Sequence, residues 1–590
     1  MSLRIIDNGG DFHVYWEYDQ WHKRNLEAVK GIEPKEDRKY IVNEKTNKKY
    51  WWVSGVQRPT ILSWQQTHAA KIILHEDLKP EEIGELPPIA ELDIYPWPED
   101  VKARPYQTQG CAQAMKFERA LIGDEQGLGK TMTSIGAIKG LELKGKDSFP
   151  CIVICPSSTK LNWQREWQKF SDKKAIVLDS SMSAQKRKNW FSYVHAGLAH
   201  VVIVNYESLS TFCIDSYPQE KTKGGKRKPW HSTDVVLKPF MQHFKSGILD
   251  ESHRCKDATT NQSKFIIRIF STLKYRLLLS GTPVVNKPID LFPQLAILGV
   301  LYKMFAAKVE QASMQNIVKY FKDRYCEGGT GANNLKELNY LMNLHCFFRR
   351  EKKDVAKDLP DKMRQTILCD ITTRTEYTRC VNDFQQFLED SGMYDDEAIA
   401  RRMRGEIMTK MMQLKQISAR GKMNEVKEYV NEVMEAGEKL ILFCHLHEIV
   451  DECKKLWPDA VTVTGRDNMQ QRQGHIDAFQ NNPNCKLIIC NHKAAGVGIT
   501  LTASSRVAFI EYPWTYADCV QCEDRAHRIG QINNVMCTYF LGQDTVDERM
   551  WELISEKMHI GNTITGATDM MSEMEMVDRT MQLFTQKIAI

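Results

Sequence analysis

The chain has 590 residues, of which 42% are apolar and 26% are charged. This composition excludes a small disulfide-stapled protein and a mostly disordered chain, and the length suggests about four structural units. Eighty basic and 75 acidic side chains leave a net charge of +5, which permits a nucleic-acid partner without arguing for one.

The N-terminal residues and the cysteines indicate where the protein is found. Residues 1–20 contain several carboxylates and no continuous apolar core, so no signal peptide is expected. No run of about 18 apolar residues occurs, so no membrane span is expected. The 16 cysteines are expected to be reduced thiols of a soluble intracellular protein, in the cytoplasm of a bacterium or a virus-infected cell, or in a nucleus. Only Cys519 and Cys522 have C-x-x-C spacing, and without a second pair a zinc site is not favoured.

The first unit in chain order is predicted over residues 1–95, which end at a proline cluster typical of a linker. Basic side chains here interleave with Tyr50, Trp51 and Trp52, which would suit stacking on unpaired bases. The alternative is that the tryptophans form the unit's own core. A strand, a helix and two further strands are predicted around Phe12–Tyr18, Val29–Ile32, Tyr40 and Lys48–Val53.

Short apolar strands alternate with amphipathic helices over residues 100–299 and again over 436–565. Alternation of this kind predicts βαβ units and a parallel sheet in each region. Residues 300–435 are predicted to be mostly helical, and 566–590 to be a Met-rich tail. The predicted strands are Ala120–Ile122, Cys151–Cys155, Val201–Val204, Leu277–Leu279, Leu440–Phe443, Val461–Val463, Leu487–Ile489 and Val507–Ile510.

A glycine-rich loop lies between the first of these strands and a helix. Its glycines would let backbone N–H groups face phosphates at a helix N-terminus. Lys130 would reach the β- and γ-phosphates of ATP, and the Thr131 hydroxyl would ligate Mg²⁺. Asp124 stands where the strict pattern requires glycine, and a plain turn with a surface lysine is the alternative. The residues predicted to hold the nucleotide are Asp124, Glu125, Gln126, Gly127, Leu128, Gly129, Lys130 and Thr131.

Two further sets of residues complete a phosphoryl-transfer site. Asp250 follows an apolar strand and would ligate Mg²⁺, and Glu251 would orient and deprotonate the attacking water. Alone, such a pair is usually a solvated turn, but the upstream phosphate loop favours catalysis. Arg525 and Arg528 share a helix face in a region without its own phosphate loop, so they would reach across a cleft as arginine fingers. The alternative for them is a surface pair.

These motifs, in this order, resemble those of Snf-type ATPases of helicase superfamily two, from about Arg104 to Lys557. The resemblance implies an α/β fold of two RecA-like parallel-sheet lobes with a helical insertion and a small N-terminal α/β module. It also implies ATP and Mg²⁺ as cofactors. The implied partner is duplex DNA, including forked DNA or DNA with single-stranded parts.

The resemblance also assigns individual roles. Gln107 matches an adenine-reading motif, and Gly498 and Gln521 match nucleotide-binding positions. The segment Arg349–Val355 with Leu359-Pro360 resembles the one that joins the lobes. The residues that match DNA-contacting motifs are Ser157, Asn162, Trp163, Asn205, Tyr206, Ser280, Thr282, Gly496, Thr500 and Trp514.

Some details are similar to the annealing-helicase branch of the family, namely Ser252, the stretch Thr545–Glu548 and a HARP-like module over residues 1–95. Gln126 departs from the usual methionine. The basic loop 221–228 is favoured as a solvated insertion over a phosphate contact.

The predicted function is an ATP-dependent translocase on double-stranded DNA that remodels forks or displaces bound proteins. One alternative is a strand-separating DNA or RNA helicase, for which no wedge element is identified. Another is the motor subunit of a nuclease or restriction system. A non-enzymatic DNA-binding scaffold is disfavoured, because the candidate catalytic residues are all present.

Overall fold

The computed structural model describes most of the chain. The features predicted at 221–228 and 566–590, and the candidate DNA contacts Thr282 and Gly496, lie outside the described residues. The described residues are 4–7, 11–15, 22–42, 49–67, 71–74, 83–179, 182–219, 230–281, 288–309, 311–326, 333–391, 397–492, 498–552 and 554.

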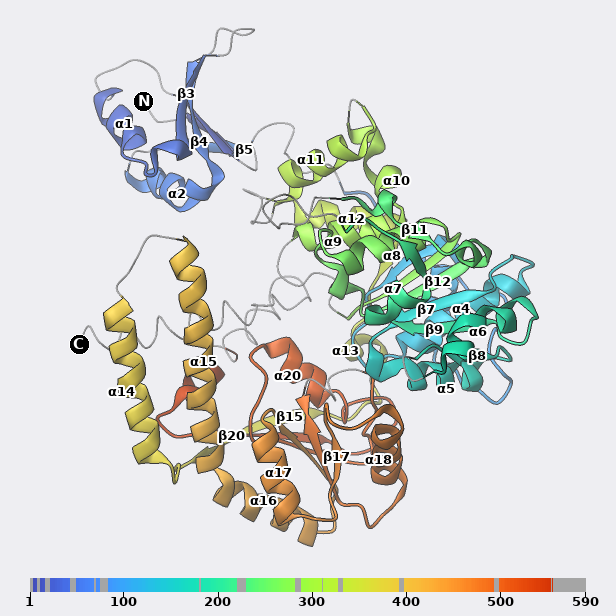
Figure 1. The fold of residues 1–590 in the computed structure, drawn as a ribbon. Coiled ribbons are helices and arrows are strands. Elements are labelled where there is room, and N and C mark those ends of the chain that lie inside the picture. The colour runs from blue at the N-terminus through green and yellow to red at the C-terminus, as the bar shows by residue number, and fades with distance from the viewer. Residues whose placement is uncertain are drawn as a thin grey trace.

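The N-terminal unit is a five-stranded sheet that packs against two helices (Figure 1). Its strand order is β3-β4-β2-β1-β5, and all pairings are antiparallel except that of β1 with β5. Phe12 and Val14 alternate with half-buried residues along β2, so they face the core. The elements are β1 (Arg4–Asp7), β2 (Asp11–Tyr15), α1 (His22–Lys30), β3 (Arg38–Val42), β4 (Lys49–Ser54), α2 (Arg58–Thr67) and β5 (Lys71–Leu74).

The aromatic residues of β4 divide between the two faces of this sheet. Trp51 packs against the buried core cluster. Tyr50 and Trp52 point the other way, because successive strand residues face opposite sides. The Tyr50 ring lies 4.1 Å from His13 and 5.3 Å from Tyr15, centroid to centroid. An aromatic face therefore lies opposite the core.

The first lobe is a seven-stranded sheet in the order β14-β6-β13-β12-β7-β9-β8, with every pairing parallel. β7, β9 and β13 are buried along their whole length, because helices cover both faces of such a sheet. Its elements are α3 (Pro105–Phe117), β6 (Arg119–Ile122), α4 (Lys130–Leu143), β7 (Cys151–Cys155), α5 (Lys160–Phe170), β8 (Ala175–Val177), α6 (Ala184–His195), β9 (Val201–Asn205), α7 (Leu209–Phe212), β12 (Ser246–Asp250), α8 (Asn261–Ser271), β13 (Tyr275–Leu279), α9 (Leu291–Leu298), α10 (Leu301–Phe305), α11 (Met314–Tyr325), α12 (Leu335–His345) and β14 (Phe347–Phe348), with the ribbon β10 (Ile214–Ser216) and β11 (Val236–Leu237).

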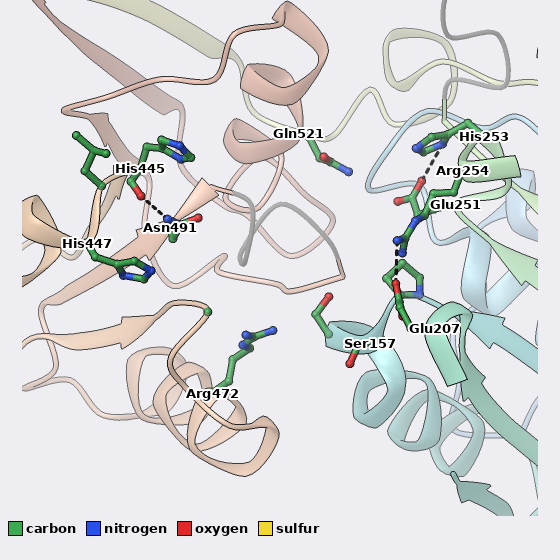
Figure 2. A pocket seen from close by; sticks show the side chains of 14 residues that line it. Ser157, Glu207, Glu251, His253, Arg254, His445, His447, Arg472, Asn491 and Gln521 are labelled. Carbon is green, nitrogen blue, oxygen red and sulfur yellow. Dashed lines mark hydrogen bonds and ion pairs between the residues drawn. The ribbon is translucent and has the colours of Figure 1, made fainter. Parts of the chain in front are cut away.

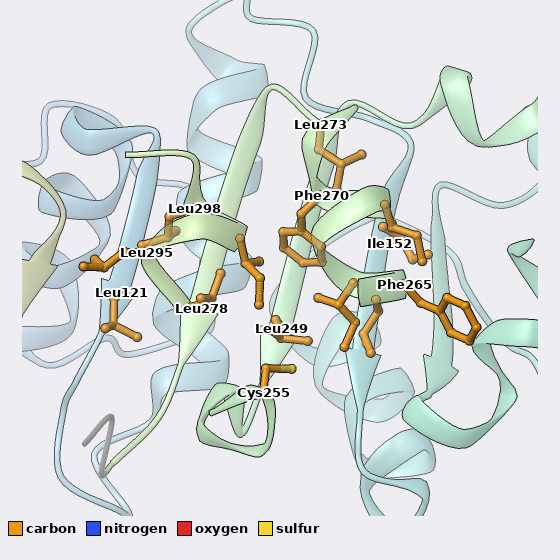
Figure 3. Close-up of a cluster of buried hydrophobic side chains, with 14 of the residues drawn as sticks. Leu121, Ile152, Leu249, Cys255, Phe265, Phe270, Leu273, Leu278, Leu295 and Leu298 are labelled. Carbon is orange, nitrogen blue, oxygen red and sulfur yellow. The ribbon is translucent and has the colours of Figure 1, made fainter. Parts of the chain in front are cut away.

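Alternate residues of these strands build two separate cores. On one face, Leu249 and Leu278 lie beneath Phe270 of α8 and Leu295 of α9 (Figure 3). On the other face, their strand neighbours such as Ile248 pack with residues of α4 and α5. The sheet is therefore packed on both faces, and the loops at its carboxyl edge carry the polar groups.

The second lobe is a six-stranded parallel sheet in the order β15-β20-β19-β16-β18-β17. The predicted pair of parallel sheets is thus confirmed. The helices α14 and α15 project from this lobe as a long pair (Figure 1). The elements are α13 (Lys352–Val355), β15 (Lys362–Cys369), α14 (Arg374–Ser391), α15 (Glu397–Gly421), α16 (Met423–Glu435), β16 (Leu440–Cys444), α17 (His447–Leu456), β17 (Val461–Val463), α18 (Met469–Asn481), β18 (Leu487–Asn491), β19 (Arg506–Phe509), α20 (Tyr516–Glu523) and β20 (Val535–Gly542).

The stretch 300–435 contributes two strands as well as helices. β14 adds to the edge of the first sheet and β15 to the edge of the second, so the sequence between them links the two sheets directly. Within the described residues no single helix is long and apolar enough to cross a membrane. One bent pair, Pro288–Leu298 with Leu301–Lys308, meets that length and composition test together, at an angle of 118°.

Candidate nucleotide site and inter-lobe pocket

The predicted catalytic residues of both lobes line one narrow cavity of about 60 Å³. The glycine-rich loop follows β6, and Asp250 ends β12, so both lie at the carboxyl edge of the first sheet, where α/β proteins bind ligands. The lining residues are Gln126, Gly127, Gly129, Lys130, Thr131, Thr159, Asn162, Trp163, Asp250 and Glu251 from the first lobe, and Gly498, Asp524, Arg525 and Arg528 from the second.

The loop is shaped by two glycines in the left-handed region, Gly127 (φ 86°) and Gly129 (φ 82°). Lys130 begins α4, and its ammonium donates to the carbonyl oxygens of Asp124 at 2.7 Å and Glu125 at 3.4 Å. Burial lowers the pKa of Lys130, an effect opposed by the charge of Glu251. The Lys130 ammonium thus lies within the glycine-rich loop.

Asp250 and Glu251 occupy different environments. Burial, reinforced by the charge of Glu251, raises the pKa of Asp250 to about 6, while a hydrogen bond from Trp163 Nε1 at 2.9 Å opposes the rise. Glu251 has a left-handed backbone (φ 54°), a conformation that costs a non-glycine residue energy and is often found at functional sites. Its Oε2 lies 3.5 Å from Nδ1 of His253, whose pKa burial lowers to about 4. The imidazole is therefore neutral near pH 7.

The two candidate fingers differ in their freedom. Arg525 is 4% exposed and donates to the carbonyls of Gln521 and Ile499, and burial lowers its pKa to about 10. Arg528 is half-buried and donates to Ile499 O at 3.0 Å and Thr500 Oγ1 at 2.9 Å. Arg528 is therefore the more exposed of the two residues.

Two oxygen donors in the cavity fit a magnesium ion. Thr131 supplies a hydroxyl and Asp250 a carboxylate, and Mg²⁺ is usually held by one or two carboxylates together with phosphates and water. No cluster of three or more His, Cys, Asp or Glu suited to a metal occurs in the described part of the chain. This donor set is suited to a Mg²⁺ ion whose remaining ligands are phosphate oxygens of the substrate and water.

The side chains of several residues predicted to hold the nucleotide have partners within the protein. The Asp124 carboxylate is fully buried and binds the Arg350 guanidinium, with Nε donating to Oδ1 at 2.9 Å. Gln107 uses both ends of its amide, accepting from the Arg104 backbone and donating to Leu128 O. Leu128 is 1% exposed in a small apolar cluster. Their predicted role in holding the nucleotide stays a prediction, and it would have to use the backbone N–H groups of the loop rather than the Asp124 and Leu128 side chains.

The segment that joins the lobes contacts both sides of the cavity. The Lys352 backbone donates to Glu125 Oε2 at 2.7 Å in the loop, and its ammonium lies 2.7 Å from Asp524 Oδ2 in the second lobe. Lys362 and Arg364 bind the acidic pair Glu523-Asp524, with Lys362 Nζ 3.0 Å from Asp524 and Arg364 Nη2 2.6 Å from Glu523. These contacts were not predicted.

A second, larger pocket of about 870 Å³ lies between the lobes, with side chains of both facing it (Figure 2). Gln521, predicted to hold nucleotide, lines this pocket rather than the narrow cavity. The lining residues are Pro156, Ser157, Ser158, Glu207, Glu251, His253 and Arg254 from the first lobe, and His445, Leu446, His447, Gly465, Arg472, Asn491 and Gln521 from the second.

The predicted DNA contacts fall into two groups. Ser157 lines the larger pocket, and Asn162 and Thr500 line a neighbouring one of about 160 Å³. The other described residues are buried. Trp163 Nε1 donates to the Asp250 carboxylate, and the Tyr206 hydroxyl donates to the Asp250 backbone carbonyl. These residues, whose predicted contact with DNA stays a prediction, are Trp163 (1% exposed), Tyr206 (2%), Asn205 (6%), Ser280 (0%) and Trp514 (4%).

On the second lobe's side of this pocket, sequence reasoning singled out Gln521 but not His445 or Asn491. His445 and Asn491 stand at the carboxyl ends of β16 and β18, and Asn491 Nδ2 donates to His445 O at 2.6 Å. The rings of His445 and His492 stack with centroids 4.6 Å apart. The available signal was their position just past predicted strands, where parallel sheets present ligand-binding groups.

Comparison with known proteins gives two matching family models. Residues 20–423 match the SNF2-related domain, and residues 421–530 match the helicase conserved C-terminal domain. The mouse DNA annealing helicase and endonuclease ZRANB3 is 26% identical over 497 residues, which cover 82% of this chain and 43% of the relative.

A Caenorhabditis elegans homologue of SWI/SNF-related matrix-associated actin-dependent regulator of chromatin subfamily A-like protein 1 is 27% identical, covering 79% of this chain and 62% of its own. The chain thus spans about half the length of these relatives. The Sulfolobus solfataricus SWI2/SNF2 ATPase core in complex with dsDNA covers 81% of this chain and 95% of its own, at 23% identity and a TM-score of 0.36.

The buried pair of Asp124 and Arg350 gives a stability prediction. Arg350→Met leaves the buried carboxylate without its cation, which should cost about 3–5 kcal/mol. Arg104→Met is the matched control, since it breaks a bidentate pair with Asp358 whose side chains are 31% and 63% exposed, and should cost about 0–1 kcal/mol. Urea denaturation followed by tryptophan fluorescence measures both, and equal costs would contradict the assignment.

Proposed function

The chain belongs to the SNF2-related family, and on that premise we propose that it is a DNA-dependent ATPase that translocates on double-stranded DNA. The observation that carries the proposal is the shared cavity. Lys130, Asp250 and Glu251 come to it from one lobe, and Arg525 and Arg528 from the other. A scaffold without catalysis would not need these charges to converge from two lobes.

The proposed chemistry divides the work among these groups. Lys130 would exchange its loop carbonyls for the β- and γ-phosphates of ATP, while Thr131 and Asp250 would hold Mg²⁺, which neutralises phosphate charge. Glu251 would orient the attacking water and take its proton. Arg528 and its buried neighbour Arg525, both carried by the second lobe, would stabilise the charge on the transferred phosphoryl group.

The cavity is far smaller than the roughly 300–1,000 Å³ of ordinary ligand pockets. Nucleotide entry therefore requires the lobes to separate, and binding would draw the arginines back onto the phosphates. Such opening and closing is a hinge motion, and it would alternately widen and narrow the larger pocket between the same lobes. That coupling provides a route from hydrolysis to movement along DNA.

The larger pocket is the proposed DNA site. Arg254 and Arg472 stand on its two sides and could neutralise phosphates, and Ser157, His445 and Asn491 offer hydrogen bonds. Contacts of these kinds position the nucleic-acid backbone without reading base sequence. We therefore expect binding to be insensitive to sequence and weakened by salt.

Fork remodelling is the proposed use of this motor. One relative named above, mouse ZRANB3, is a DNA annealing helicase and endonuclease, and the aromatic face of the N-terminal unit could stack on unpaired bases. ATPase rates with duplex, forked and single-stranded DNA and with RNA, compared side by side, test the proposal. Strand separation of a long duplex would favour the helicase alternative.

The proposed role of Glu251 predicts that its substitution affects turnover but not ATP binding. Glu251→Gln should retain ATP binding but lose about 10²–10⁴ in turnover, because the amide cannot accept the proton of water. Lys130→Ala should lose nucleotide affinity as well. DNA-stimulated phosphate release and binding of a fluorescent ATP analogue measure the two effects. Near-normal turnover of Glu251→Gln would remove Glu251 from the role of base.

Arg528 should act mainly in the transition state. Arg528→Ala should reduce kcat by about 10³-fold or more while changing KM for ATP little, as arginine fingers do. Arg165→Ala is the control, since this exposed arginine also contacts the other lobe, at Asp477, but lies outside the nucleotide cavity. A change confined to KM would show that Arg528 serves ground-state binding.

The two faces of β4 give separate predictions. Trp51→Ala should lower the thermal stability of the N-terminal unit, because Trp51 packs on its core. Trp52→Ala removes the hydrogen bond from Trp52 Nε1 to Asp11 and should lower stability less than Trp51→Ala. It should reduce the preference for forked over plain duplex DNA about tenfold or more, since stacking contributes about 1–3 kcal/mol per base. Thermal melting and competition binding separate the outcomes. An unchanged fork preference in Trp52→Ala would exclude stacking at this position.

A further inference from the structure

The segment that joins the lobes contains a lysine whose surroundings are unusual for a linker. The Lys352 side chain is 8% exposed, although its neighbour Lys353 is 75% exposed. Burial of an ammonium is costly unless carboxylates and carbonyls surround it. Lys352 therefore occupies a built position, and its partners indicate its role.

Those partners come from both sides of the nucleotide cavity. On the first lobe, Lys352 lies 4.0 Å from Glu125 Oε1, and a Cβ on Gly127 would lie 3.3 Å from its Cε. On the second lobe, its ammonium lies 2.7 Å from Asp524 Oδ2 and donates to His527 O at 3.2 Å. One ammonium thus contacts the phosphate loop and the turn that follows α20.

The contacts on the second lobe bracket the candidate fingers. Asp524 immediately precedes Arg525, and His527 immediately precedes Arg528. Arg528 also packs against the same glycine as the lysine, because a Cβ on Gly127 would lie 3.4 Å from Arg528 Cγ. Lys352 and Arg528 therefore lie side by side on Gly127.

The carboxylate partner has no freedom to move away. Asp524 is 1% exposed, and it also accepts from Lys362 Nζ at 3.0 Å. The two lysines hold the pKa of Asp524 well below its usual value against the effect of burial. The turn that carries the arginines is thus anchored to residues 352–362 through ion pairs of Asp524 with Lys352 and Lys362.

We propose that Lys352 is a positioning residue for catalysis, which aligns Arg528 with the phosphate loop by binding Glu125 and Asp524 at once. This rests on the proposed function, since it assigns Arg528 to the γ-phosphate. Lys352 touches no substrate in this scheme. It acts by fixing the distance between the loop that holds phosphates and the turn that delivers the guanidinium.

The test uses the full chain and DNA-stimulated ATPase kinetics. Lys352→Met keeps the packed stem and removes the charge, and it should lower kcat about 10- to 100-fold with little change in KM for ATP, because small misplacements of a catalytic group cost about that much. Lys353→Met, on the same helix α13, should match the unmodified protein. Lys352→Arg, which keeps the charge, should retain more turnover than Lys352→Met.

A double variant separates positioning from mere support of the loop. If Lys352 acts through Arg528, Lys352→Met added to Arg528→Ala should cost little further kcat. Losses that multiply, or a rise in KM with kcat unchanged, would overturn the proposal. If Lys352→Met melts well below the parent protein, the same comparison is made with Lys352→Gln, which also removes the charge.

Hydrogen exchange gives a readout that does not need hydrolysis. Lys352→Met should speed amide exchange over residues 516–528, while β7 and β9 of the first lobe remain protected, and Lys353→Met should change neither. Unchanged exchange over 516–528 would refute the positioning role even if the protein hydrolysed no ATP. A parent protein without ATPase, but with this exchange response, would instead refute the proposed function.

Discussion

Charge pairing between the lobes is the constraint on which the rest of the site depends. Each lobe places an acidic pair beside a candidate catalytic cation, Asp124-Glu125 in the loop of Lys130 and Glu523-Asp524 directly before Arg525. One basic segment, residues 349–364, binds both pairs. Because a buried carboxylate without a cation costs several kcal/mol, these pairings limit where the segment can lie, and they bring the two halves of the cavity together.

The parallel sheets explain why a few loops are enough to line both the nucleotide cavity and the larger pocket. Strands buried on both faces have their only free polar positions at their ends, and parallel strands bring all carboxyl ends to one edge. In each lobe that edge faces the cleft, so β6 and β12 supply the nucleotide cavity while β16 and β18 supply the far wall of the larger pocket. The two sites are neighbours because the same edges build both.

Sequence patterns predicted what depends on local chemistry. The apolar runs marked most strands of both lobes. The order of loop, carboxylates and arginines predicted one site for Lys130, Glu251 and Arg528, and these residues line one cavity in the structure. The patterns missed what depends on distant partners. Asp124 binds Arg350, which is 226 residues away in the sequence, and Trp163 binds Asp250, which is 87 residues away. No sequence periodicity reveals such pairs. β15 was missed because its half-exposed alternation at a sheet edge lacks the apolar run of a central strand.

Glu251 is the residue at which the two sites meet. It lines both the nucleotide cavity and the larger pocket, and its left-handed backbone directs its carboxylate to the boundary between them. Its contact His253 is neutral and lies 3.0 Å from the Ser280 hydroxyl, at the end of β13. A neutral imidazole can reorient between a carboxylate and a hydroxyl without the cost of moving a buried charge. A displacement of Glu251 would therefore change the lining of both pockets at once.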